Sequence, residues 1–239
     1  KVFLFVSEVA SGAVENIVLF IQLFIPTYTI AVGAAQGTAA AAYYYQLMLL
    51  LAYLVESFLN KVLIPLIYSY VMLALLNGLW SEEKLSLLLD FIAKGVGFAL
   101  KVSLGTVTGL SFVQAVIVPV ASGLRISAMR KAISAIPGIG GVAEGMTELM
   151  LGSAVLIKNS MGVLLLALLA GACLLPLLNI LVVTGVVKLG AAVTGIVSDK
   201  RISACTDRVG EGCFLLLRCV FTAVALFVIV IAVISYTAA

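Results

Sequence analysis

Five stretches of this chain carry no charged residue and are each long enough to cross a bilayer: residues 16–55, 62–81, 102–124, 159–187 and 219–239. A helix needs about 20 apolar residues to cross a hydrocarbon core about 30 Å thick. A soluble domain of 239 residues has too small an interior to hide five such segments. The alternating pattern of a transmembrane barrel is absent. We therefore predict an all-α polytopic membrane protein, with residues 1–239 forming a single integral membrane domain.

The composition indicates a lipid environment and excludes several classes of function. Hydrophobic residues make up 64% of the chain and charged residues 10%, against about 25% charged in soluble domains. The net charge of +3 and the lack of long basic runs argue against a nucleic-acid partner. The four cysteines form no CxxC pair and there is no histidine, so we expect no metal and no cofactor. The sequence contains no HExxH, GxSxG or Walker A motif, and a Ser/His/Asp set cannot be assembled without histidine, so we do not expect an enzyme.

The sequence is internally duplicated. The Val-Ala-Ser-Gly motif of residues 9–12 recurs at 120–123, and Pro26 and Pro65 recur 111 positions later as Pro137 and Pro176. After six extra residues the offset becomes 117, and residues 81–86 align with 198–203. We predict two tandem pseudo-symmetric repeats, over about residues 1–112 and 113–239. Repeats of this kind place a pathway or partner site near the interface between them.

Each repeat is predicted to contain a proline-broken helical hairpin, a span, an amphipathic surface helix and a second span. In the first repeat, Pro26 and the glycines Gly33 and Gly37 interrupt the apolar region, so that a second helix covers about 38–59. A span over about 62–79 follows. Apolar residues at helical spacing from 85 to 96 then indicate an amphipathic helix that lies along the membrane surface or packs on a partner, before a span over about 102–123.

The charged face of this surface helix recurs in the second repeat. Glu83, Asp90, Lys94 and Lys101 have charged counterparts 117 positions later, namely Lys200, Asp207, Glu211 and Arg218. The second repeat is therefore expected to have its own surface helix, between spans over about 160–187 and 214–236. Cys205 and Cys213 fall on the weakened apolar face of that helix and are interpreted as small packing residues.

The second hairpin differs from the first because it is charged, and its residues are candidate pathway or partner contacts: Arg125, Arg130, Lys131, Glu144, Glu148, Lys158 and the adjacent Asn159. A charge at the bilayer centre costs about 2.5–3.5 kcal/mol on insertion scales. We therefore interpret this hairpin as re-entrant or as lining an aqueous cavity. Glu144 and Glu148 lie four residues apart and either bind a cation or proton or are solvated at the surface. Lys158 and Asn159 either line a pathway or sit at the interface with the lysine extended towards water.

Asp199, Lys200 and Arg201 follow Ser198 in the pattern of a capped helix start, and they are alternatively a docking surface for a cytosolic partner. The remaining candidates are hinge or packing residues. Small residues spaced as GxxxG occur at 33–37 and at 141–145, where Gly141 and Gly145 would let helices approach closely in lipid. Residues 138–143 can be spelled GxGxxA, but no strand precedes them, so Gly140 is assigned to a tight turn after Pro137 and not to nucleotide binding.

Several of these segments together resemble one known family. They are Ile136-Pro137 followed by Gly140-Gly141, Leu156-Ile157-Lys158-Asn159, the Leu-Leu-Pro-Leu-Leu run around Pro176, and above all Ser198-Asp199-Lys200-Arg201-Ile202. Their order and spacing are similar to the C-terminal membrane region of stage III sporulation protein AE. The resemblance implies a multi-pass protein of the mother-cell membrane that surrounds the forespore. It also implies partners from the same operon, including a secretion-type ATPase, in a channel or feeding-tube apparatus.

Two functions are carried forward from the sequence. The first is a component of the sporulation channel, which oligomerises or seats partner subunits within the lipid bilayer. The second is a self-sufficient transporter or ion channel for a small solute, with its site in the charged hairpin. Because the chain starts at Lys1 without the family's N-terminal signal-like and extracytoplasmic part, we expect it to be a piece of a longer product.

Overall fold

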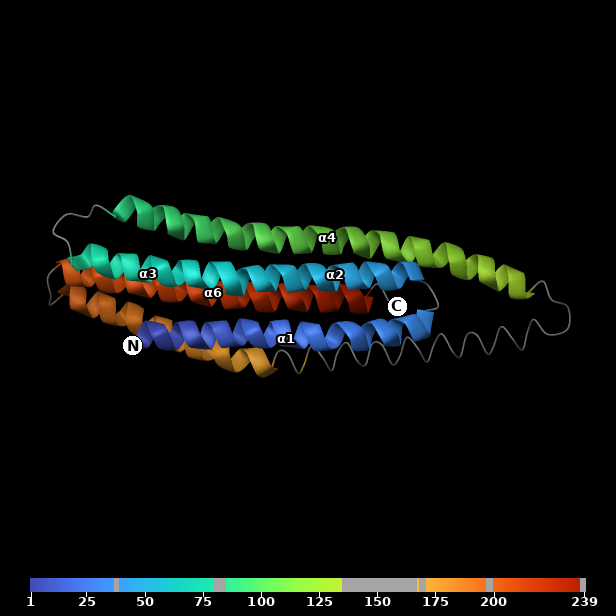
Figure 1. Cartoon of the computed structure of the whole chain (residues 1–239), viewed down its shortest axis with the longest axis horizontal. Helices are drawn as coiled ribbons and strands as arrows, with labels where there is room; N and C mark the ends of the chain where they lie inside the picture. The colour runs from blue at the N-terminus through green and yellow to red at the C-terminus, as the bar shows by residue number, and fades with distance from the viewer. Residues whose placement is uncertain (37–38, 80–84, 135–166, 168–170, 197–199, 237–239) are drawn as a thin grey trace.

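The computed structural model of the chain is a bundle of long helices that lie side by side (Figure 1). It describes residues 1–36, 39–79, 85–134, 167, 171–196 and 200–236. The elements are α1 (Val2–Gln36), α2 (Ala39–Phe58), the π-helical turn η1 (Leu59–Leu63), α3 (Ile64–Leu79), α4 (Ser86–Ser134), a helix over Gly171–Ile196, and α6 (Lys200–Tyr236). No strand occurs within the described ranges. The prediction of an all-α fold is confirmed for this part of the chain.

Four helical segments are long and apolar enough to cross a membrane: Val2–Leu23, Leu49–Gly78, Gly171–Ile196 and Ile202–Ala232. Many of their large apolar side chains point outwards, including Leu175 at 69% and Ile196 at 85% exposure. Apolar surface of this extent is costly in water and favourable against lipid chains. The predicted span over 102–123 lies inside α4, and the side chains of its last ten residues are not described.

α2 and α3 agree with the predicted helices over 38–59 and 62–79. They are not separate, however, because η1 joins them into one continuous helical run over residues 39–79. Pro65 has no N–H to donate to the carbonyl of Lys61, and its ring would crowd that carbonyl. The wider turn η1 lies directly before this proline, and the Ile64 N–H donates to the Leu59 carbonyl five residues back. A π turn of this kind accommodates a proline without ending the helix. Glu56 therefore lies inside a candidate span, not at its boundary.

Three other predicted boundaries are also wrong in the described residues. α1 continues through Pro26 to Gln36, so the first hairpin is not broken at this proline. α4 and α6 each join the predicted surface helix to the following span in one helix. A proline removes one hydrogen bond of the ladder, which neighbouring helices in a membrane bundle can compensate. A change from an amphipathic to an apolar surface does not itself end a helix when no stop signal intervenes.

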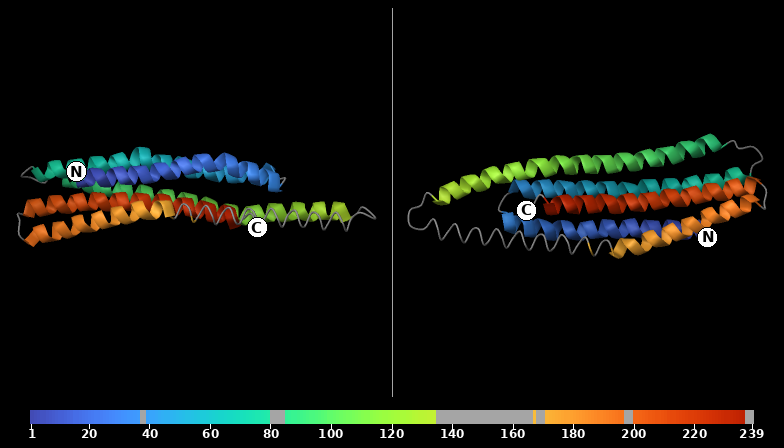
Figure 2. Two further views of the ribbon diagram at one scale, coloured as in Figure 1. Left: turned by 90° about the horizontal axis from the view of Figure 1, so that it is seen from below. Right: turned by 180° about the vertical axis from the view of Figure 1, so that it is seen from behind.

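The core forms where the apolar stripes of the helices meet. In α1, the buried residues Phe3, Val6, Ala10, Val14 and Ile17 recur every three or four positions, which places them on one face. α1, α2 and α3 lie in one layer, and α6 lies with the Gly171–Ile196 helix in the other (Figure 2). α6 packs against α1, α3 and α4.

Small residues on α6 permit this close packing. A Cβ atom at Gly212 would collide with the Val71 side chain of α3. Phe20 of α1 meets Phe227 of α6 edge to face, with ring centroids 5.6 Å apart. This is a favourable aromatic geometry. The free thiols of Cys213 and Cys219 are buried in the same core, as expected for cysteines that act as small apolar residues.

Candidate functional site

The predicted pathway residues fall largely outside the described part of the chain. Arg125, Arg130 and Lys131 lie on the C-terminal part of α4, and Lys200 and Arg201 open α6, but their side chains are not described. Five further candidates are outside the described residues altogether: Glu144, Glu148, Lys158, Asn159 and Asp199. All of them remain predictions.

Of the predicted hinge and packing residues, some lie within the described helices and the others lie outside the described residues. Pro26 and Gly33 lie within α1, Pro65 lies in the first turn of α3, and Pro176 is half-buried in the Gly171–Ile196 helix. None of these four ends a helix. The others are outside the described residues: Gly37, Pro137, Gly140, Gly141 and Gly145.

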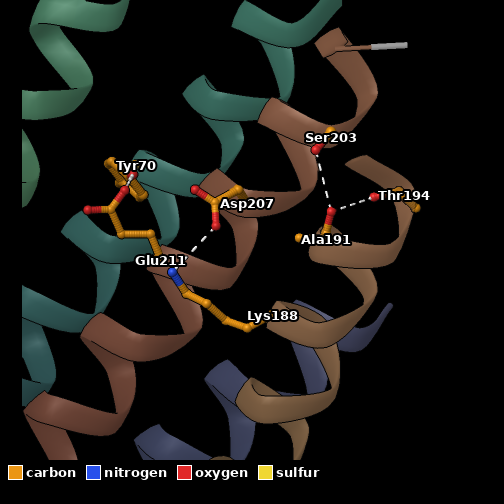
Figure 3. A network of polar contacts seen from close by, with 7 residues as sticks. All are labelled: Tyr70, Lys188, Ala191, Thr194, Ser203, Asp207 and Glu211. Atoms are coloured by element: carbon orange, nitrogen blue, oxygen red, sulfur yellow. Dashed lines mark hydrogen bonds and ion pairs between the residues drawn. The ribbon is translucent and has the colours of Figure 1, made fainter. Parts of the chain in front are cut away.

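Polar contacts join α3, α6 and the Gly171–Ile196 helix (Figure 3). The Tyr70 hydroxyl of α3 donates to the Glu211 carboxylate of α6 at 2.8 Å, and Tyr70 itself is fully buried. The Lys188 ammonium of the Gly171–Ile196 helix lies 3.5 Å from the Asp207 carboxylate. Asp207 and Glu211 are one helical turn apart, so a single face of α6 serves two neighbouring helices.

A third contact joins α4 to α6. The Arg208 guanidinium donates to the Asp90 carboxylate at 2.6 Å. This hydrogen bond and the positive charge lower the pKa of the Asp90 carboxyl below its usual value. The sequence marked Asp90, Asp207 and Glu211 as the charged face of surface helices. In the structure each of them has a partner on a neighbouring helix, although Asp90 and Asp207 stay exposed. We refer to Tyr70, Asp90, Lys188, Asp207, Arg208 and Glu211 as the paired cluster.

Glu56 contrasts with the paired cluster. It is fully buried between helices, and neither carboxyl oxygen has a hydrogen-bond partner among the described residues. The Cys173 and Cys219 thiols lie within electrostatic range of it. Ser111 and Thr184 are also buried with unpartnered hydroxyls. A carboxyl group inside a membrane span is costly and is a candidate for function by default.

Sequence reasoning missed Glu56 because it falls between two uncharged stretches, where a charged residue is expected to mark the end of a span. Pro65 supported the same expectation of a boundary, but a membrane helix can continue through a proline. Allowing for this possibility would have placed Glu56 inside a span. No group of three or more Cys, Asp or Glu side chains that could hold a metal ion occurs among the residues the structure describes.

The fold defines the class of this protein: a polytopic α-helical membrane protein with a carboxylate buried inside one of its candidate spans. The family model for stage III sporulation protein AE matches residues 1–238, and the chain belongs to this family. The chain is 22% identical over 203 residues to stage III sporulation protein AE of Bacillus subtilis (strain 168). The match covers 84% of this chain and 51% of that relative, so the chain spans about half of its length. No solved structure matches the chain.

Proposed function

We propose that this chain is a multi-pass component of a channel-like, secretion-like complex that connects mother cell and forespore and is needed for forespore development. The family match over residues 1–238 carries the proposal, because it assigns the chain to a sporulation family. The four apolar helices support a site of action in a membrane. In this proposal the chain contributes a path or a scaffold and is not an enzyme.

The proposed membrane is that of the mother cell where it engulfs the forespore. The proposed partners are other stage III proteins, including a secretion-type ATPase, and further copies of the same chain. The charged residues of the second predicted repeat, such as Arg130 and Lys131, are the proposed contacts with these partners or with the pathway. Positively charged side chains are suited to a partner surface that carries negative charge.

The test is co-purification during sporulation. The tagged full-length protein, expressed from its own promoter, is solubilised from sporulating cells, and the proteins that remain bound are identified by mass spectrometry. We expect other stage III membrane proteins and the ATPase, and we expect fewer of them when Arg130 and Lys131 are changed to glutamate. The control is Arg130→Lys with Lys131→Arg, which keeps both positive charges and changes only the shape of the two side chains. A strictly monomeric protein without these partners would overturn the proposal.

Glu56 favours a second candidate, a self-sufficient transporter or ion channel for a small solute. Carboxylates buried in membrane spans mark ion and proton pathways in many transporters. This alternative predicts solute or ion flux in proteoliposomes containing only this protein. The flux should disappear in Glu56→Gln or in the pair Glu144→Gln and Glu148→Gln. Absence of flux in the unaltered protein, or flux unchanged in these variants, would exclude it.

A further inference from the structure

A groove lies on the outer side of α6, between α4 and the Gly171–Ile196 helix, and its volume is about 580 Å³. Residues of all three helices line it, and their ribbons are seen from behind in Figure 2. The volume is within the range of pockets that hold one small molecule, about 300–1,000 Å³. The lining is mainly leucine, with Leu104 from α4, Leu181 from the Gly171–Ile196 helix, and Leu217 from α6.

The groove contains two charged side chains, and both are cationic. Lys101 comes from α4 and Arg218 from α6. Among the described residues neither has an ion pair, although the Arg218 guanidinium lies 4.5 Å from the ring centre of Phe214. The two cations of the paired cluster, Lys188 and Arg208, each have a carboxylate within 3.5 Å. The groove therefore has an uncompensated positive charge next to an apolar surface.

The position of the groove limits what can occupy it. One side and the floor belong to the candidate spans Gly171–Ile196 and Ile202–Ala232, so a ligand reaches the groove from the bilayer. Leucine side chains offer an apolar ligand chain a favourable contact. A lysine and an arginine together suit a phosphate group, which accepts several charge-assisted hydrogen bonds. Basic pockets between membrane helices bind the head groups of anionic lipids for this reason.

We propose that this groove binds an anionic phospholipid of the surrounding membrane, with its phosphate between Lys101 and Arg218 and an acyl chain along the leucines. A zwitterionic lipid carries its own positive group, which cancels the charge of its phosphate and is repelled by the two cations. The groove is therefore expected to select by head-group charge. This inference does not depend on the channel proposal.

The test measures lipid selection by the full-length protein in mixed vesicles of phosphatidylglycerol and phosphatidylcholine. The protein is extracted in mild detergent and its bound lipids are quantified by native mass spectrometry. We expect phosphatidylglycerol to be enriched at least tenfold over its fraction in the vesicles. The double variant Lys101→Gln with Arg218→Gln should lose this enrichment. Lys94→Gln is the matched control, because Lys94 is an exposed lysine of α4 that does not line the groove.

A second variant tests the groove independently, in case Lys101→Gln with Arg218→Gln does not fold. Leu181→Trp fills the groove and leaves both cations in place, so it should reduce the bound lipid of either kind. Equal retention of phosphatidylcholine and phosphatidylglycerol would overturn the proposal. So would phosphatidylglycerol enrichment that survives both the double variant and Leu181→Trp. Cross-linking between cysteines placed at 104 and 181 of different copies would also overturn it, because a second copy would then occupy the groove.

Discussion

The charges of this protein behave differently in two regions of the bundle. In the first turns of α4 and α6, the paired cluster matches each charge with a partner on another helix. Elsewhere in the bundle, Glu56, Lys101 and Arg218 have no ion pair among the described residues. Paired charges hold helices in register and are accounted for by structure. Unpaired charges in an apolar setting are costly to keep, so they are where function is expected.

The largest expected effect comes from reversing the charge at Glu56. Glu56→Lys places an ammonium group where the described structure offers no carboxylate, and an uncompensated buried charge costs about 3–5 kcal/mol. We expect little variant protein in the membrane fraction and a greatly lowered unfolding temperature in detergent. Glu56→Gln is the control, because it keeps the shape of the side chain and cannot ionise, and it should accumulate normally. Normal accumulation of Glu56→Lys would show that water reaches the side chain at position 56.

The importance of Glu56 was hidden in the sequence for a physical reason. Hydropathy separates spans at charged residues, and Glu56 and Lys61 stand between the uncharged stretches 16–55 and 62–81. The helix does not end there, because the turn η1 accommodates Pro65. The all-α class and the apolar segments were predictable because they depend on local composition. The continuity of the helix was not, since it depends on how one proline is accommodated.

The paired cluster, too, could be predicted from the sequence only in part. Asp90, Asp207 and Glu211 could be identified as a charged face from their helical spacing. Their partners Arg208, Lys188 and Tyr70 could not, because those pairings depend on which helices are neighbours and at what register. The end of each predicted surface helix was also not predictable, because α4 and α6 continue into the following apolar segment without a stop signal. Asp90 and Asp207 remain exposed while they pair with neighbouring helices.

A second prediction concerns the close approach that allows the paired cluster to form. Gly212→Ala introduces a Cβ atom that collides with Val71, so α3 and α6 must move apart. Overpacking of this kind costs about 1–3 kcal/mol, and we expect a clearly lowered unfolding temperature. Adding Val71→Ala should restore part of the loss. Gly12→Ala is the matched control, because no atom lies within 4 Å of its Cβ position. A tolerated Gly212→Ala would mean that this contact is loosely packed.

A third prediction removes one bond from the paired cluster. Tyr70→Phe keeps the buried ring and deletes the hydroxyl that donates to Glu211. A hydrogen bond to a charged group contributes about 1.5–3 kcal/mol, and partial exposure of Glu211 places the expected loss near the lower limit. The control is Tyr68→Phe, whose ring packs against Phe3 at 5.9 Å. Equal unfolding temperatures for the two variants would show that the hydrogen bond from Tyr70 to Glu211 does not stabilise the protein.

The smallest expected effect concerns Asp90, which is exposed although it is paired. Arg208 lowers its pKa in the folded protein, so the stabilisation is present at neutral pH and is lost as the pH falls through the acid range below about 4. Asp90→Asn should lower the unfolding temperature slightly at pH 7. The difference from the unaltered protein should shrink towards zero on acidification.

High salt should reduce the Asp90 difference at pH 7 as well, because exposed pairs are screened. Glu56→Gln provides the comparison, since a buried carboxyl is shielded from dissolved ions. Any stability difference between Glu56→Gln and the unaltered protein should therefore persist in high salt. A salt-sensitive Glu56 difference would show that water and ions reach that site. The distinction between paired, solvated charges and unpaired, buried ones would then be lost.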